Sequence, residues 1–123
     1  MAHRFLSSFA AITILLLFTE NAYATYEIVE IEKPFYVRSL AGEALDPTGA
    51  PVSGVEVSDC DQGFTKVITA TRSDEKGRFI LPVSGVSVHY LSFRALGFNP
   101  LRITVIIRNT APKRLRIKLP IGG

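Results

Sequence analysis

The chain has 123 residues, of which 47% are hydrophobic and 20% charged, and this balance disfavours a disordered chain and a coiled coil. Nine glycines, seven prolines and no tryptophan favour many turns over long helices. The formal net charge is +3. With Cys60 as the single cysteine, a disulfide framework is excluded, and we expect neither a metal cluster nor a cofactor. The length suits one small domain.

The N-terminus has the features of an export signal. Arg4 precedes an apolar run over 9–18, and Ala22 and Ala24 place small residues before a cleavage point. We therefore predict a signal peptide over 1–24 that is cut after Ala24. This run of ten residues, which includes Thr13, is too short for the roughly 20 of a membrane-spanning helix, so we expect a secreted or periplasmic protein without a transmembrane segment after cleavage.

Alternation of apolar and polar residues, with turn residues between the alternating segments, predicts β-strands in the remaining chain. We expect a lead-in segment over 25–35 and one domain over 36–121. The predicted strands cover 36–45, 52–58, 64–72, 78–82, 91–96, 101–107 and 114–119. About seven short strands with frequent turns indicate an all-β fold, an antiparallel Greek-key β-sandwich.

The same alternation predicts which side chains form the core. All of the predicted core residues are small, branched or aromatic. They are Leu40, Ala44, Val52, Val55, Val57, Phe79, Leu81, Leu91, Phe93, Ala95, Phe98, Ile103, Val105, Leu115, Ile117 and Leu119.

Four stretches resemble the carboxypeptidase regulatory-like domain family, a transthyretin-like or prealbumin-like β-sandwich. They are a strand, an Asp-x-x-Gly turn and a Gly-x-Pro-hydrophobic-x-Gly segment over 40–57, a Ser-Asp-x-x-Gly-x-Phe hairpin over 73–81, a strand ending in Gly-Phe over 91–98, and a closing strand over 115–119. The resemblance implies a non-catalytic accessory fold and brings no catalytic residues. We expect a stand-alone exported member that acts by binding an unknown protein or carbohydrate partner.

These residues give little support for a catalytic function. His89 is expected at the surface or at a strand end, and no Gly-x-Ser-x-Gly motif occurs. A small transthyretin-related hydrolase is the enzymatic alternative. That enzyme needs several histidines and a C-terminal Tyr-Arg-Gly-Ser, whereas this chain ends in Leu-Pro-Ile-Gly-Gly over 119–123. We therefore predict that the protein is not an enzyme.

The triplet Asp59-Cys60-Asp61 is expected in a loop. Two carboxylates are too few for a calcium site, and they should raise the pKa of the Cys60 thiol. An unpaired cysteine in an exported protein still permits an intermolecular disulfide. A structural component of the cell envelope, associating through sheet edges or Cys60, is therefore a further alternative.

Charge is distributed unevenly along the chain. The segment 25–75 holds ten carboxylates and four basic residues, whereas 76–123 holds nine basic residues and no acidic one. The last strand should present Arg114, Arg116 and Lys118 on one face, with neighbouring members about 7 Å apart. We favour internal pairing, with Glu43 and Glu56 as candidate partners. The other possibility is contact with an acidic protein surface, an anionic glycan or a lipid headgroup; nucleic acid is disfavoured because the nearby aromatics are predicted core.

Overall fold

The computed structural model describes residues 27–82 and 85–122. The predicted signal peptide over 1–24 lies outside the described residues. Within them, no helix is long and apolar enough to cross a membrane.

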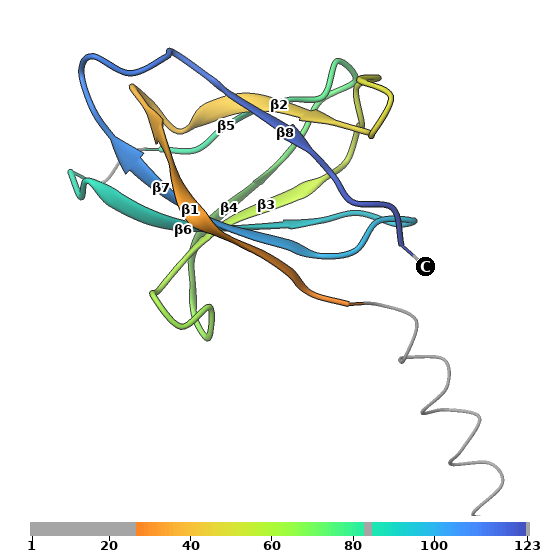
Figure 1. Cartoon of the computed structure of the whole chain (residues 1–123), viewed down its shortest axis with the longest axis horizontal. Helices are drawn as coiled ribbons and strands as arrows, with labels where there is room; N and C mark the ends of the chain where they lie inside the picture. The colour runs from red at the N-terminus through yellow and green to blue at the C-terminus, as the bar shows by residue number, and fades with distance from the viewer. Residues whose placement is uncertain (1–26, 83–84, 123) are drawn as a thin grey trace, which may run out of the picture.

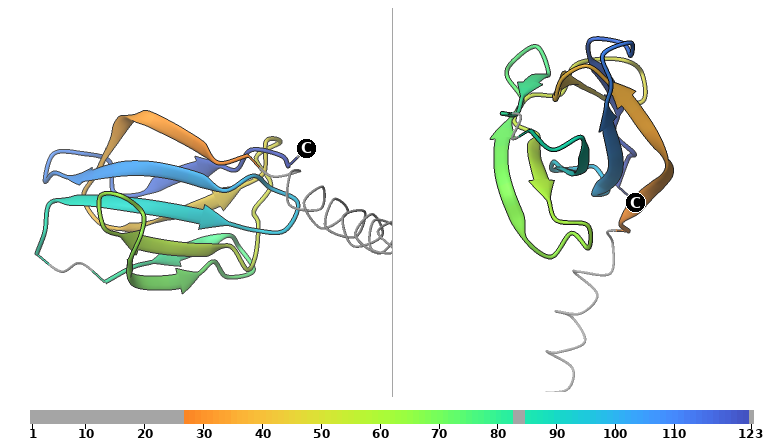
Figure 2. Two further views of the ribbon diagram at one scale, coloured as in Figure 1. Left: turned by 90° about the horizontal axis from the view of Figure 1, so that it is seen from below. Right: turned by 90° about the vertical axis from the view of Figure 1, so that its left-hand side faces the viewer.

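The described residues form eight strands in two sheets that pack face to face (Figures 1 and 2). The larger sheet contains, in spatial order, β1 (Val29–Val37), β7 (Leu101–Ile107), β6 (Val88–Arg94), β3 (Glu56–Cys60) and β4 (Val67–Arg72). The smaller sheet contains β5 (Arg78–Ile80), β2 (Ala41–Leu45) and β8 (Leu115–Lys118) in that order. The predicted all-β sandwich is confirmed, and the Greek-key connectivity stays a prediction.

The strand directions correct one part of the prediction. β1 runs parallel to β7, and β2 runs parallel to β8, so both sheets are mixed rather than antiparallel. A parallel pair needs a long connection between its strands, and about 70 residues separate the members of each pair here. Alternation within one strand carries no information about the direction of a neighbour that is so distant in sequence.

The lead-in segment is the second part of the prediction that the structure corrects. Most of the expected lead-in over 25–35 belongs to β1, which pairs with β7 through residues on both sides of a bulge between Ile31 and Phe35. β1 is an edge strand and is mostly exposed, so it lacks the alternation that marks the inner strands. The strand predicted over 36–45 is divided, because the chain turns at 38–40 from the larger sheet to the smaller one.

The predicted core is confirmed at its centre. All of its members are buried except Val52, Ala95 and Phe98, which are partly buried and pack against it. Phe79 of the smaller sheet and Phe93 of the larger sheet meet edge to face, with ring centroids 5.5 Å apart, and so join the two layers. The core also contains Val37 and Leu101, which are not among the predicted core residues.

Two Asp-x-x-Gly turns hold the connections between strands. The Asp46 carboxylate accepts bonds from the Thr48 hydroxyl at 2.6 Å and the Ala50 amide at 2.9 Å. These bonds, with Thr48 first, lower the pKa of Asp46. In the second turn, Gly77 has φ of +73°, and a Cβ there would come within 2.6 Å of the Ala44 carbonyl oxygen. The turn residues are therefore explained by the fold alone.

Candidate functional site

β8 places the predicted basic residues on the outside of the smaller sheet. Leu115 and Ile117 are buried, whereas Arg116, Lys118 and the preceding Arg114 are exposed. We call Arg114, Arg116 and Lys118 the β8 cations. Because β8 is an edge strand, these side chains lie along the border of the smaller sheet rather than at its centre.

The internal pairing that we favoured for the β8 cations does not form within 4 Å. Among the described residues, the pairs at that distance join Arg72 to Glu56, His89 to Asp59 and Arg102 to Glu30. Glu56, one of the two candidate partners, lies in the other sheet, where its carboxylate is 3.7 Å from Arg72.

Glu43, the other candidate, does lie in register with Arg116. Its other register neighbour is Arg78 of β5, so one carboxylate stands between two guanidinium-bearing residues. A single carboxylate cannot offset Arg78 together with the β8 cations. The outer face of the smaller sheet therefore keeps a positive excess, which is the condition that favours an anionic partner.

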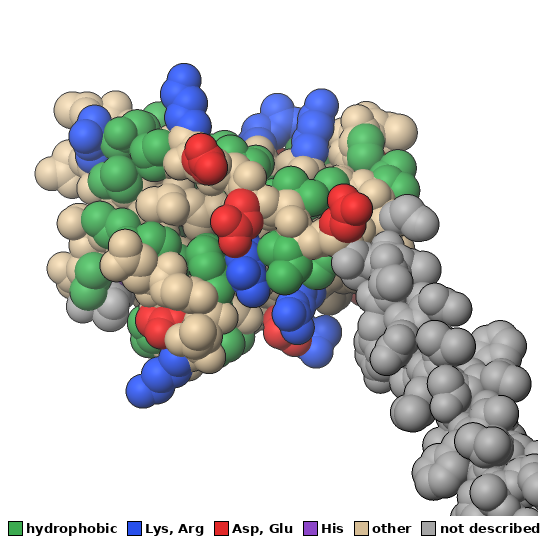
Figure 3. Space-filling view, turned by 60° about the horizontal axis from the view of Figure 1, so that its bottom comes forward, with side chains coloured by type: hydrophobic (Ala, Val, Ile, Leu, Met, Phe, Trp, Pro, Cys, Tyr) green, Lys and Arg blue, Asp and Glu red, His purple; other side chains and the backbone are tan. Residues whose placement is uncertain are grey.

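Basic residues of the larger sheet have contacts of their own. A guanidinium nitrogen of Arg102 lies 3.4 Å from a carboxylate oxygen of Glu30. The guanidinium carbon of Arg102 also lies 4.9 Å from the centroid of the Phe64 ring. Arg108 stands over Tyr36 at 4.1 Å. On the face seen in Figure 3, Lys and Arg side chains are mixed with Asp and Glu. The β8 cations differ from these residues because, in the part of the chain that the structure describes, they have no carboxylate within 4 Å and no aromatic ring beneath them.

A cleft of about 450 Å³ lies between the edge strands β1 and β8. Ile31 and Phe35 of β1 line one part of it, and Arg116, Ile117 and Lys118 of β8 line another. The cleft thus brings two of the three predicted contact residues beside apolar side chains. The views in Figure 2 show β1 and β8 on the same side of the sandwich.

A larger cleft, of about 730 Å³, lies at one end of the sandwich. Its lining includes Leu96, which is 94% exposed, and the charged residues Glu56, Arg72 and Arg94. In the sheet register, Glu56 lies between Arg72 and Arg94, so this cleft contains a carboxylate beside its cations. The smaller cleft differs because Arg116 and Lys118 line it without any carboxylate, so its positive excess is the greater of the two.

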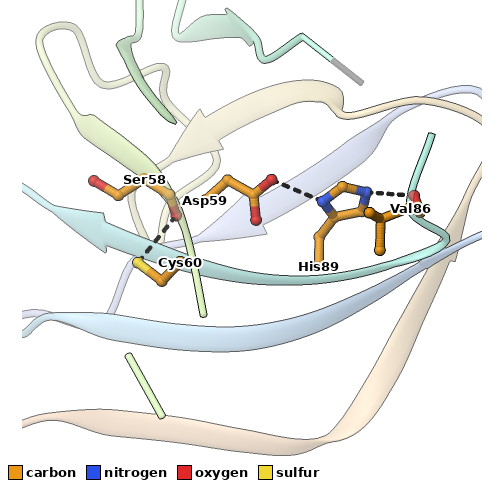
Figure 4. Close-up of polar contacts among 5 residues, drawn as sticks. All are labelled: Ser58, Asp59, Cys60, Val86 and His89. Atoms are coloured by element: carbon orange, nitrogen blue, oxygen red, sulfur yellow. Dashed lines mark hydrogen bonds and ion pairs between the residues drawn. The ribbon is translucent and has the colours of Figure 1, made fainter. Parts of the chain in front are cut away.

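His89 is buried, which corrects the expected surface or strand-end position. Only 3% of the residue is exposed, on the inner side of β6. Its Nδ1 lies 2.7 Å from the Asp59 carboxylate, and its Nε2 lies 2.8 Å from the Val86 carbonyl oxygen (Figure 4). Asp59, expected in a loop, is a buried residue of β3.

The contacts with Asp59 and Val86 engage both ring nitrogens of His89. A carbonyl oxygen can only accept, so Nε2 must carry a hydrogen. The contact with the Asp59 carboxyl then needs one more proton, either on Nδ1 or on the carboxyl itself. With both ring nitrogens engaged, His89 has no nitrogen left to act as a base toward a substrate.

Cys60 is the last residue of β3 and is 5% exposed, so the expected loop position is wrong for this residue too. Its Sγ lies 3.8 Å from the Ser58 carbonyl oxygen. Burial raises the pKa of the Cys60 thiol, and the charges of Asp59 and Asp61 raise it further. The predicted direction is confirmed with a different main cause. The intermolecular disulfide stays a prediction, and it requires this end of β3 to open.

Asp61 has a structural role in the loop that follows. Its carboxylate accepts the Lys66 amide at 3.0 Å, the Thr65 amide at 2.8 Å and the Thr65 hydroxyl at 2.7 Å. These bonds, with Lys66 first, lower the pKa of Asp61. They hold a loop in which Phe64 adopts φ of +57° and packs edge to face on Tyr90. Across residues 27–82 and 85–122, no group of three metal-ligating side chains gathers.

The family comparison agrees with this architecture. No curated protein matches the chain. The model of the carboxypeptidase regulatory-like domain matches residues 39–120, two thirds of the sequence, and this span contains every strand except β1. The chain therefore belongs to the carboxypeptidase regulatory-like domain family.

Proposed function

We propose that this protein is an exported, non-catalytic binding module that engages an anionic partner in the cell envelope or outside the cell. The observation that carries the proposal is the exposed row of β8 cations, which lacks an ion pair within 4 Å among the described residues. Family membership supports the non-catalytic part, because carboxypeptidase regulatory-like domains are β-sandwich modules without catalytic residues of their own. Export rests on the signal peptide that the sequence predicts.

The location of charge supports binding over catalysis. The buried His89 has both ring nitrogens engaged, and the Cys60 thiol is buried with a raised pKa. Neither group is placed to react with a substrate at the surface. The β8 cations, in contrast, are directly accessible. Accessible unpaired charge accelerates encounter with an oppositely charged partner and makes the encounter sensitive to salt.

The experiment replaces Arg114, Arg116 and Lys118 together with glutamine. Binding is measured to three anionic probes, namely vesicles of phosphatidylglycerol, a sulfated polysaccharide and an acidic protein, at low and moderate salt. Neutral phosphatidylcholine vesicles serve as the uncharged reference. We expect the wild-type protein to bind at least one anionic probe in a salt-sensitive manner, and we expect the triple variant to lose about tenfold or more in affinity.

A matched control replaces Lys66, Lys76 and Arg94 with glutamine, which removes the same charge from exposed positions outside β8. Unfolding by urea is measured for both variants. Lost binding with unchanged stability in the β8 variant alone supports the proposal. An equal loss of binding in both variants would show that binding depends only on net charge. If the β8 variant loses stability while its binding is unchanged, the β8 cations have a structural role.

A further inference from the structure

We infer that the cleft between β1 and β8 binds a single-chain amphiphile with an anionic headgroup, such as an alkyl carboxylate derived from lipid. The inference rests on the proposed function, since it names the class of anionic partner that β8 engages. It combines two features of one cleft, an apolar interior and two cations.

The apolar part of the cleft is supplied by both sheets. Ile31 and Phe35 of β1 supply its accessible side chains, whereas Leu101 of β7 and Ile117 of β8 border it and are almost fully buried. Ile31 is 38% exposed and Phe35 is half-buried, so apolar surface faces water at this point. A ligand that covers these side chains gains the free energy of removing that surface from water. A purely polar anion, such as inorganic phosphate, would not use this part of the cleft.

The charged part is supplied by β8 alone. Arg116 and Lys118 line the cleft, and none of the other lining residues is acidic. Two positions apart on one strand, the two side chains lie about 7 Å from each other on the same face. Their donors can therefore approach one small headgroup from two sides. Glu43 of β2 is the carboxylate in register with Arg116, and it is also in register with Arg78 of β5.

The size of the cleft selects a small ligand over a macromolecular surface. About 450 Å³ falls within the usual range of small-molecule pockets, about 300–1,000 Å³. The basic residues lie on the β8 side and the exposed Ile31 on the β1 side, so the ligand must carry its charge at one end. This requirement is met by an alkyl chain with a terminal carboxylate. It is not met by a glycan, which lacks the apolar end.

The test uses the protein from Thr25 to Gly123 and alkyl probes kept below micelle-forming concentrations. Decanoate is titrated into ¹⁵N-labelled protein, and amide chemical shifts give both the affinity and the location. We expect saturable shifts in β1 and β8, centred on Ile31 and Ile117, and little change at Leu96 in the larger cleft. Decylammonium has the same chain with the opposite charge, and acetate has the same headgroup without the chain. Both should bind at least tenfold more weakly than decanoate.

Variants separate the two halves of the cleft. Replacing Arg116 and Lys118 with glutamine should weaken decanoate binding about tenfold and remove the preference over decylammonium. Ile31→Ser should weaken decanoate binding without changing that preference. Ile68→Ser is the matched control, because Ile68 is a 62% exposed isoleucine on β4, at the opposite edge of the larger sheet. We expect it to leave decanoate binding unchanged.

Several results would overturn the inference. They are absent or non-saturable binding of decanoate, equal binding of decylammonium, and shifts centred on the larger cleft. Tighter binding of an apolar peptide through its C-terminal carboxylate would replace the amphiphile with a protein partner. If the β8 variant loses binding to the sulfated polysaccharide or acidic protein while decanoate does not bind, the proposed function stands and only this inference fails.

Discussion

At the scale of single residues, the buried pair of His89 and Asp59 carries the sharpest energetic consequence. Both side chains are almost fully buried, and His89 also depends on the Val86 carbonyl. Removing one partner leaves the other buried without its hydrogen-bond partner, and breaking a buried pair of this kind costs about 3–5 kcal/mol when the remaining group is charged. Since a domain of this size is stable by about 5–15 kcal/mol, His89→Leu should remove a substantial part of the free energy of unfolding.

Urea unfolding of His89→Leu, Asp59→Leu and the double variant measures this consequence. Replacing both members of a buried pair with apolar residues is often nearly neutral, so the double variant should be more stable than either single variant. A loss below 1 kcal/mol in His89→Leu would contradict the assigned role of the pair. Additive losses in the double variant would show that the two side chains act independently.

The pairing of His89 with Asp59 is also a feature that the sequence alone does not predict. His89 and Asp59 are 30 residues apart, and neither belongs to a recognisable motif. Alternation does place His89 on the same face of its strand as Leu91 and Phe93, which are both predicted core. That position could have indicated burial. It could not have supplied the partner, because the pairing of β3 with β6 is a property of the tertiary fold.

At the scale of elements, the loop between β3 and β4 should depend on the ionisation of Asp61. Its folded pKa is lowered below the ordinary value of 3.8 by hydrogen bonds from Lys66 and Thr65. A lowered folded pKa means that the unfolded chain binds the proton more readily. The stabilisation is therefore complete above pH 3.8 and is lost as the pH falls through the folded pKa.

This prediction is measured by urea unfolding of the wild type and of Asp61→Asn between pH 6 and pH 2. The wild type should lose more stability than the variant below pH 3.8, because asparagine has no proton to gain. Asp46→Asn is the matched variant, since Asp46 also has a lowered pKa in an exposed turn. Identical pH profiles for the wild type and Asp61→Asn would show that the loop bonds do not depend on this charge.

Elements also differ in how far the sequence predicts them. The inner strand β7 was predicted with its observed bounds, and the alternation around Leu115 and Ile117 correctly separated the buried from the exposed face of β8. β1 was missed because an exposed edge strand with a bulge has no regular alternation. The cleft beside β8 was missed for the same reason, since one of its walls is β1.

At the scale of the whole molecule, β1 makes the folded unit larger than the family match. The match begins at residue 39, but β1 pairs with β7 on both sides of its bulge and contributes Val37 to the core. Without β1, the edge of β7 would be exposed and the apolar surface under Phe35 and Val29 would face water. The predicted cleavage after Ala24 would leave β1 intact, so export and folding are compatible.

The last prediction compares a chain that begins at Thr25 with one that begins at Ser39. Full burial of a valine such as Val37 contributes about 1.5–3 kcal/mol, and the ladder with β7 is lost as well. The shorter chain should therefore unfold at clearly lower urea concentration and should associate through the exposed edge of β7. Gel filtration and urea unfolding provide the two measurements. Equal stability of the two chains would show that β1 is an accessory strand, and N-terminal sequencing of exported protein that starts beyond residue 37 would show that it is removed in the mature protein.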